Sequence, residues 1–164
     1  MIMAEIFPLF ISYQQVAVFD PNMDNPFNDW GSRHVSQGFS WRAESVSFRV
    51  PDGEGCIVEV LQGNEPSTLT GVPTREILTP FEVAKDNLVA VGSITEEHNV
   101  SIPSGAKYQL TFELLPAGVH GDNKFDHAIR FRFVKADNPI FEIRKADGEM
   151  DTSSPLDLHA RPAQ

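Results

Sequence analysis

The chain has 164 residues, of which 41% are hydrophobic and 22% are charged, and these values are typical of one globular domain rather than a disordered chain. Its formal net charge of −10 disfavours anionic partners, such as nucleic acid or a membrane surface, and favours basic proteins. The single cysteine, Cys56, excludes an intramolecular disulfide framework, and no stretch approaches the roughly 18 apolar residues of a membrane span.

The N-terminal segment, MIMAEIFPLF, is apolar but contains Glu5 and Pro8 and no basic residue. A secretory signal peptide has a basic region before its apolar part, and this segment lacks one. We therefore expect no signal peptide and a soluble, cytoplasmic protein. Residues 9–19 follow as the first predicted strand.

The next stretch, DPNMDNPFNDW, spans residues 20–30 and combines acidic residues with prolines and aromatic rings. The spacing of Asp20, Asn22 and Asp24 resembles the start of a calcium loop, because a hard cation takes oxygen ligands from alternate residues of a tight turn. The sixth and twelfth positions of such a loop require Gly and Glu, and here they hold Asn25 and Gly31. An irregular calcium- or ligand-binding loop at Asp20–Asp24 therefore stays only as the alternative hypothesis.

One segment is predicted to be helical, from Asp29 to about Gln37, where Gly38 ends it. The carboxylate of Asp29 suits the helix start, since it can accept main-chain N–H groups there. The indole of Trp30 is expected to pack in the core.

Strict alternation of apolar and polar residues then recurs along the chain, which indicates strands with one buried face. The predicted strands after the helix cover residues 45–50, 56–62, 77–83, 88–94, 98–102, 108–115, 127–135 and 140–144. Together with residues 9–19, they predict an all-β fold: an antiparallel β-sandwich of about eight or nine strands with one short helix. We assign residues 1–146 to this single domain and expect a disordered tail over residues 147–164.

The sequence offers little catalytic chemistry. The densest group of ionisable residues, His120, Asp122, Asp126 and His127, could hold a divalent metal, but a polar hairpin loop explains it better. Cys56 lies in an apolar run, where a buried, inert thiol is expected. We predict a protein that is not an enzyme and that needs no metal or cofactor.

Short motifs resemble a known family in their order along the chain. They are Ile11-Ser12-Tyr13-Gln14-Gln15, Val18-Phe19, Asp29-Trp30, Gly38-Phe39, Ser47-Phe48 and Ile102-Pro103-x-Gly105-x-x-Tyr108-Gln109-Leu110, followed by Pro116-Ala117. This succession resembles the competence protein J family. The resemblance implies a small, cytoplasmic, non-enzymatic protein that binds and inhibits a nuclease. The segment between Phe19 and Asp29, and the tail, lie outside the matching pattern.

The resemblance assigns no residue to a nuclease interface, so the contact surface must be predicted from charge and residue type. Residues 1–30 contain four acidic residues and no Lys or Arg, and aromatic side chains beside carboxylates could anchor a basic partner. Carboxylates could occupy the nuclease's basic groove, or one could ligate its catalytic metal. The large aromatic Tyr13 is expected in the core. The predicted partner-binding residues are Asp20, Asp24, Phe27, Asp29, Trp30 and Trp41.

Overall fold

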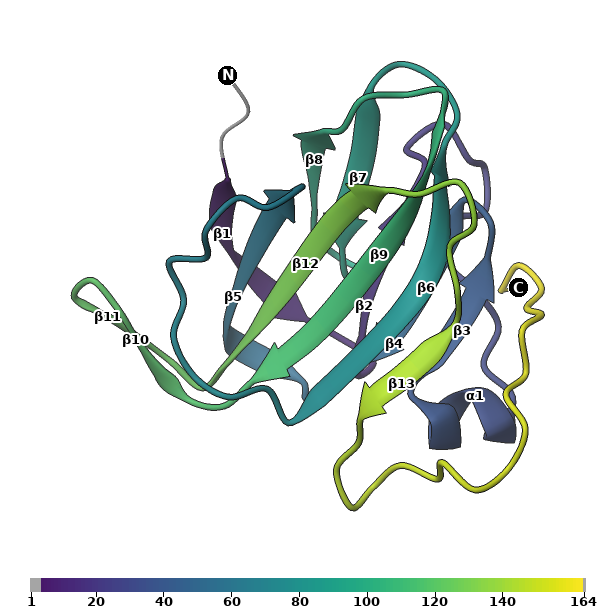
Figure 1. The fold of residues 1–164 in the computed structure, drawn as a ribbon. Helices are drawn as coiled ribbons and strands as arrows, with labels where there is room; N and C mark the ends of the chain where they lie inside the picture. Colours follow the sequence, from purple (N-terminus) through teal and green to yellow (C-terminus); the bar gives the residue numbers. More distant parts are fainter. Residues whose placement is uncertain (1–3, 164) are drawn as a thin grey trace.

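The computed structural model describes residues 4–163, and Figure 1 shows their strands arranged in two main layers. The six-stranded sheet has the order β1 (Glu5–Ile11), β5 (Gly53–Gln62), β12 (His127–Lys135), β9 (Ala106–Leu115), β6 (Arg75–Val83) and β13 (Glu142–Lys145). The five-stranded sheet has the order β3 (Phe39–Arg42), β4 (Ser45–Arg49), β2 (Gln15–Phe19), β7 (Leu88–Gly92) and β8 (Glu97–Ser101). A separate hairpin consists of β10 (Gly118–His120) and β11 (Asn123–Phe125), and the helix α1 spans Ser32–Gln37.

The two larger sheets share one hydrophobic core. Ten side chains that the alternation predicts to point inward are buried there: Val46, Phe48, Val50, Tyr108, Leu110, Phe112, Leu114, Ile129, Phe131 and Phe133. The ring of Phe48 in β4 stacks on that of Phe112 in β9, with centroids 4.4 Å apart and planes at 7°. This contact joins the five-stranded sheet to the six-stranded sheet, so the period-two pattern identified the core faces of both.

The predicted all-β fold with one short helix is confirmed, with differences in detail. The described residues form 13 strands rather than eight or nine, because β3, β10 and β11 are too short to show alternation. In addition, β12 pairs with β5 in parallel, so the six-stranded sheet is mixed rather than wholly antiparallel. No helix in the described part of the chain is long and apolar enough to cross a membrane.

The predicted strand over residues 9–19 is in fact two strands in different sheets. β1 lies at one edge of the six-stranded sheet and β2 lies in the middle of the five-stranded sheet. Between them, Tyr13 and Gln14 have φ values of 56° and 54°, in the left-handed region. The prediction that Tyr13 lies in the core is wrong, because this turn leaves its side chain 75% exposed.

The helix begins later than predicted, and Asp29 does not cap it. Gly31 is the residue before the first turn, and its N–H donates to Nδ1 of His34 (3.0 Å). The carboxylate of Asp29 instead accepts a hydrogen bond from the N–H of Trp30 (3.0 Å). Gly38 ends the helix as predicted, with a φ of 89° that favours glycine.

The tail differs from the expected disordered segment. Residues 147–163 have almost no regular structure, but they run past α1 in Figure 1 and are hydrogen-bonded to the domain. The guanidinium of Arg33 donates to the carbonyl oxygens of Asp151, Ser154 and Pro155. At the end of the tail, the N–H of Ala163 donates to the carbonyl of Phe27 (2.9 Å). In this structure, side chains of the domain satisfy main-chain groups of the tail.

Candidate functional site

The segment 20–31, which contains most of the predicted partner-binding residues, packs on the domain. Its Met23 and Phe27 lie against Ala17, Phe19 and Ala90, which form a small second hydrophobic cluster. The rings of Phe27 and Phe19 have centroids 5.5 Å apart. Phe27 is therefore half-buried and serves at least to hold this segment against the sheet.

Asn28 fixes the same segment to the five-stranded sheet. Its buried side-chain amide donates to the carbonyl oxygens of Ser40 (2.7 Å) and Ser45 (2.9 Å), and its Oδ1 accepts from Nε of Arg42 (2.6 Å). Sequence reasoning did not identify Asn28, because an asparagine in a polar loop shows no distinctive pattern.

Asp20 uses its carboxylate for the turn that follows β2. Its Oδ1 accepts hydrogen bonds from the N–H (2.9 Å) and the side-chain amide (3.0 Å) of Asn22, as in an Asx-turn. The same amide also donates to Oδ2 of Asp86 (3.0 Å). Among residues 4–163, no three His, Cys, Asp or Glu side chains gather as a metal site. In this structure the Asp20–Asn22 spacing serves an Asx-turn.

The two tryptophans are both half-buried and hydrogen-bonded. Nε1 of Trp41 donates to the carbonyl of Pro80 (2.7 Å), and its ring meets Phe141 edge-on at 4.8 Å. Nε1 of Trp30 donates to Oε1 of Gln15 (3.3 Å), so the indole lies at the start of β2 instead of in the central core.

Two of the six predicted residues lie near opposite ends of β2. Asp20 directly follows the last residue of β2, whereas Trp30 contacts the first residue of that strand, Gln15. Segment 20–31 therefore runs along the whole length of β2. Asp24 and Asp29 are exposed on it, while Asp20 is only 9% exposed.

A different group of residues does converge at the start of β2, and we call it the Tyr13 end. It consists of the tight turn at residues 10–15 between β1 and β2 (the tip), Asp52 in the β4–β5 connection, and residues 93–97 around the β7–β8 turn. Three main-chain N–H groups of the tip donate to side chains of the other two segments: Phe10 to Glu96 (2.9 Å), Ser12 to Ser93 (2.9 Å) and Gln14 to Asp52 (2.5 Å).

The segments that form the Tyr13 end carry negative charge only. Residues 1–32, 50–74 and 86–106 contain eleven of the 23 acidic residues and none of the 13 Lys and Arg residues. The sequence already showed this for the first thirty residues. The structure shows which of these residues reach the Tyr13 end: Asp52 and Glu96 bond to its main chain, whereas Asp86 lies beside Asn22 at the other end of β2.

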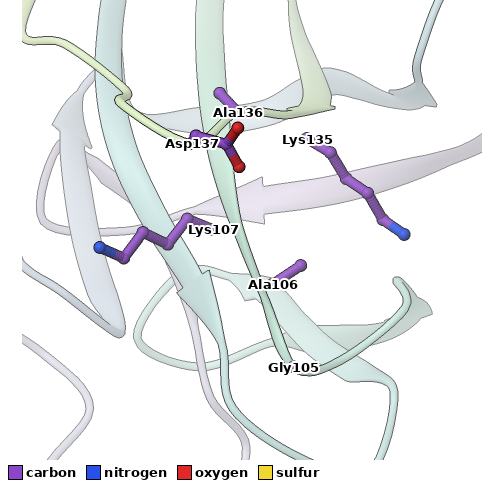
Figure 2. A pocket seen from close by; sticks show the side chains of 6 residues that line it. All are labelled: Gly105, Ala106, Lys107, Lys135, Ala136 and Asp137. Atoms are coloured by element: carbon purple, nitrogen blue, oxygen red, sulfur yellow. The ribbon is translucent and has the colours of Figure 1, made fainter.

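Two other regions lack the features expected of a surface that binds a basic protein. One is a hollow of about 450 Å³ lined by Lys107, Lys135 and Asp137. Its two lysines extend in different directions (Figure 2), and its charge is mainly positive. In the β10–β11 region, Asp122 is exposed at the hairpin turn, whereas His127 is buried in β12. Burial lowers the pKa of His127, although nearby Asp126 acts in the opposite direction.

Cys56 is buried, as predicted, and burial raises the pKa of its thiol to about 12. The thiol therefore stays protonated at neutral pH and is a poor nucleophile.

Comparison with known proteins identifies relatives of the whole domain. The model of the competence protein J (ComJ) family matches residues 8–134. A DNA-entry nuclease inhibitor from Bacillus subtilis (strain 168) is 23% identical over 124 residues, which are 74% of this chain and 92% of that protein. The crystal structure of ComJ from Bacillus subtilis, described as an inhibitor of the DNA degrading activity of NucA, superposes with a TM-score of 0.68. The two chains are 22% identical, and the match covers 83% of this chain and 99% of the ComJ chain. At this identity the likeness shows a shared fold.

Proposed function

We propose that this chain, which belongs to the competence protein J family, is a non-enzymatic inhibitor that binds a DNA-degrading nuclease. The observation that carries the proposal is the family match over residues 8–134. It is supported by a curated relative described as a DNA-entry nuclease inhibitor and by a solved structure described as an inhibitor of NucA, both of which align with most of this chain.

The charge of the chain is suited to such a partner. A nuclease that cleaves DNA needs a basic groove for the phosphates, and a protein with a net charge of −10 is attracted to that groove over long range. Carboxylates of the inhibitor would then occupy positions that phosphates occupy in the substrate complex. Inhibition by this route requires no reaction, only a complex that excludes DNA.

The proposal is tested with the purified chain and two nucleases: the NucA that the relative inhibits, and its counterpart from the organism that encodes this chain. Cleavage of a fluorescent DNA duplex is measured against increasing inhibitor at low and near-physiological salt. We expect stoichiometric inhibition of at least the cognate nuclease, and a complex of the two proteins on size exclusion.

Two controls make the result specific. The chain alone should not retard DNA in a gel, because inhibition by hiding the substrate would contradict binding to the nuclease. Absence of both inhibition and complex with the cognate nuclease, even at low salt, would overturn the proposal.

A further inference from the structure

Tyr13 is the most exposed large hydrophobic side chain in the described part of the chain, at 75%. Its φ of 56° places it in a region that glycine and asparagine adopt far more readily than an aromatic residue. The turn would therefore form more easily without a tyrosine. Because the exposed ring also contributes little to packing, the fold gives no reason for its presence.

The main chain under this ring is firmly held. The tip is bonded on one side to Asp52 and on the other to Ser93. The Ser93 hydroxyl lies within hydrogen-bond distance of the carbonyls of both Ser12 (3.0 Å) and Gln15 (2.8 Å) and can donate its proton to either. In addition, the N–H of Val50 donates to the carbonyl of Gln14 (3.0 Å). A ring on a tip held in this way loses little conformational entropy when a partner binds.

Other apolar side chains are exposed on the same end. Phe10 is 44% exposed and Ile94 is 38% exposed, and their segments are joined by the hydrogen bond from the N–H of Phe10 to Glu96. Protein interfaces typically combine a few large apolar anchors with a charged or polar rim. Here Phe10, Tyr13 and Ile94 are the anchors, and the exposed carboxylates of Asp52, Glu96 and Glu97 form the rim.

The charged side chains of the rim are all negative, because the segments of the Tyr13 end contain no Lys or Arg. The basic residue that pairs with Gln15 across the sheet, Arg49, lies beside the carboxylate of Glu149 (3.8 Å) and donates to the carbonyl of that residue (3.0 Å). The charge of this surface is therefore complementary to a basic groove.

We propose that the Tyr13 end is the surface that docks into the basic DNA-binding groove of the nuclease, with the ring of Tyr13 as its central anchor. This inference rests on the proposed function and names the contact surface for it. It moves the contact away from Asp20 and Phe27, which hold the fold, to the start of β2, where Trp30 also lies through its hydrogen bond to Gln15.

The first test compares Tyr13→Asn with Ile140→Asn. Asparagine tolerates a positive φ, so Tyr13→Asn keeps the turn and removes only the ring. Ile140 is 49% exposed and lies beside Gln109 on the side of the six-stranded sheet away from β1, so its variant controls for loss of an exposed apolar side chain. We expect Tyr13→Asn to weaken binding about tenfold or more, and Ile140→Asn to leave it unchanged.

A second test does not depend on the energetics of one side chain. Because Cys56 is buried and protonated, the variants Tyr13→Cys and Ile140→Cys each gain one reactive thiol, which a maleimide with a polymer chain labels after folding. The label at position 13 should abolish inhibition, and the label at position 140 should not.

The outcomes separate the two proposals. If the wild-type chain inhibits the nuclease and the position-13 variants inhibit equally well, the docking surface is wrong and the inhibitor function stands. Loss of inhibition in Asp24→Asn, with Tyr13→Asn unaffected, would place the contact on segment 20–30 and would also overturn the inference. If the wild-type chain itself neither binds nor inhibits, the proposed function fails and the docking surface fails with it.

Discussion

The carboxylate of Asp52 accepts a hydrogen bond from the main-chain N–H of Gln14 at 2.5 Å, although 38 positions separate the two residues. Two residues before Asp52, Val50 donates its N–H to the carbonyl of Gln14. The β4–β5 connection thus holds both main-chain groups of a residue in the left-handed conformation. The shape of the exposed tip therefore depends on a residue that the sequence gives no reason to connect with it.

Replacing Asp52 by alanine should therefore loosen the tip. We expect Asp52→Ala to lower the free energy of unfolding by about 1 kcal/mol, because the hydrogen bond is charge-assisted but exposed. Asp52→Asn keeps an oxygen acceptor and should lose less than half as much. Urea denaturation of the three proteins measures this, and equal midpoints for Asp52→Ala and wild type would contradict a holding role.

Salt should act mainly on the association rate of the inhibitor with its nuclease. Glu96 and Glu97 are exposed at the rim of the Tyr13 end, and rim charges steer the encounter more than they hold the complex. We expect the double variant Glu96→Gln/Glu97→Gln to have a lower association rate with a shallower salt dependence, and a nearly unchanged dissociation rate.

Surface plasmon resonance over a range of salt concentrations separates these rates. The control is Asp137→Asn, which also removes a carboxylate but at a residue that lines the hollow with Lys107 and Lys135. This hollow follows the end of β12 that pairs with Gln62, whereas Asp52 precedes the other end of β5. A rate that falls equally in both variants would show that only the net charge matters.

The strand pattern could be predicted from the sequence because period-two alternation directly reflects which face is buried. Phe48 and Phe112 were both assigned to inward faces, and they stack on each other across the core. The alternation does not encode which strands pair, so the parallel pairing of β12 with β5 could not be predicted. Nor does it mark a tight turn inside an apolar run, which is why β1 and β2 were taken as one strand.

The candidate site was harder to predict for a related reason. Asp20, Phe27 and Trp41 have the residue types of an interface, but each makes a local contact that explains it: a turn, a packed ring and a hydrogen bond to Pro80. In contrast, Tyr13 was expected in the core because large aromatic residues in a β-sandwich usually lie there. Its exposure follows from φ values, which a sequence of non-glycine residues does not reveal.

Removal of the ring of Phe48 should test how strongly the stacked pair holds the two sheets together. Phe48 is fully buried, so we expect Phe48→Ala to lower the free energy of unfolding by about 3–5 kcal/mol. Phe10, which is 44% exposed, provides the matched substitution, and Phe10→Ala should cost about 1 kcal/mol or less. Urea denaturation compares the two, and similar losses would contradict the assignment of Phe48 to the core.

Acid should weaken the attachment of the tail through Asp147. Burial pushes the pKa of Asp147 upward, but hydrogen bonds from Arg75 and from the N–H of Glu149, with the charges of Arg75 and Arg49, outweigh it, so the pKa lies below the usual 3.8. The native state then binds this proton less readily than the unfolded chain. The ionised Asp147 therefore contributes fully to stability at pH values above its pKa in the unfolded chain. This contribution is lost as the pH falls through its lower pKa in the native state.

The variant Asp147→Asn should therefore be less stable than wild type at neutral pH, and the difference should shrink in acid. The measurement is the urea midpoint of both proteins from neutral pH down to the onset of acid unfolding. A difference that stays constant over this range would show that the pair of Asp147 with Arg75 (2.6 Å) contributes no pH dependence.

Gln37 should control whether the end of the tail stays on the domain. Its buried side chain donates to the carbonyls of Phe39 (2.9 Å) and Asp157 (2.8 Å), and it accepts from the N–H of Asp157 (2.9 Å). Alanine at this position leaves those main-chain groups without their partner, which typically costs about 1–3 kcal/mol. We expect Gln37→Ala to raise amide hydrogen exchange over residues 155–163 far more than in the core strands.

The control for this experiment is Thr152→Ala, a substitution in the exposed part of the same tail. It should leave exchange at residues 155–163 unchanged, because the contacts of Gln37 and the bond from Ala163 to Phe27 remain. If Gln37→Ala also has no effect there, residues 155–163 must be held by their other contacts, which include those with His34, Asp29 and Phe27. Residue 163 of the tail is bonded to Phe27, so release of the tail should also loosen segment 20–31. The N–H of Asp29 donates to the carbonyl of Arg161 (2.7 Å). Faster hydrogen exchange at this N–H in Gln37→Ala would show the loosening.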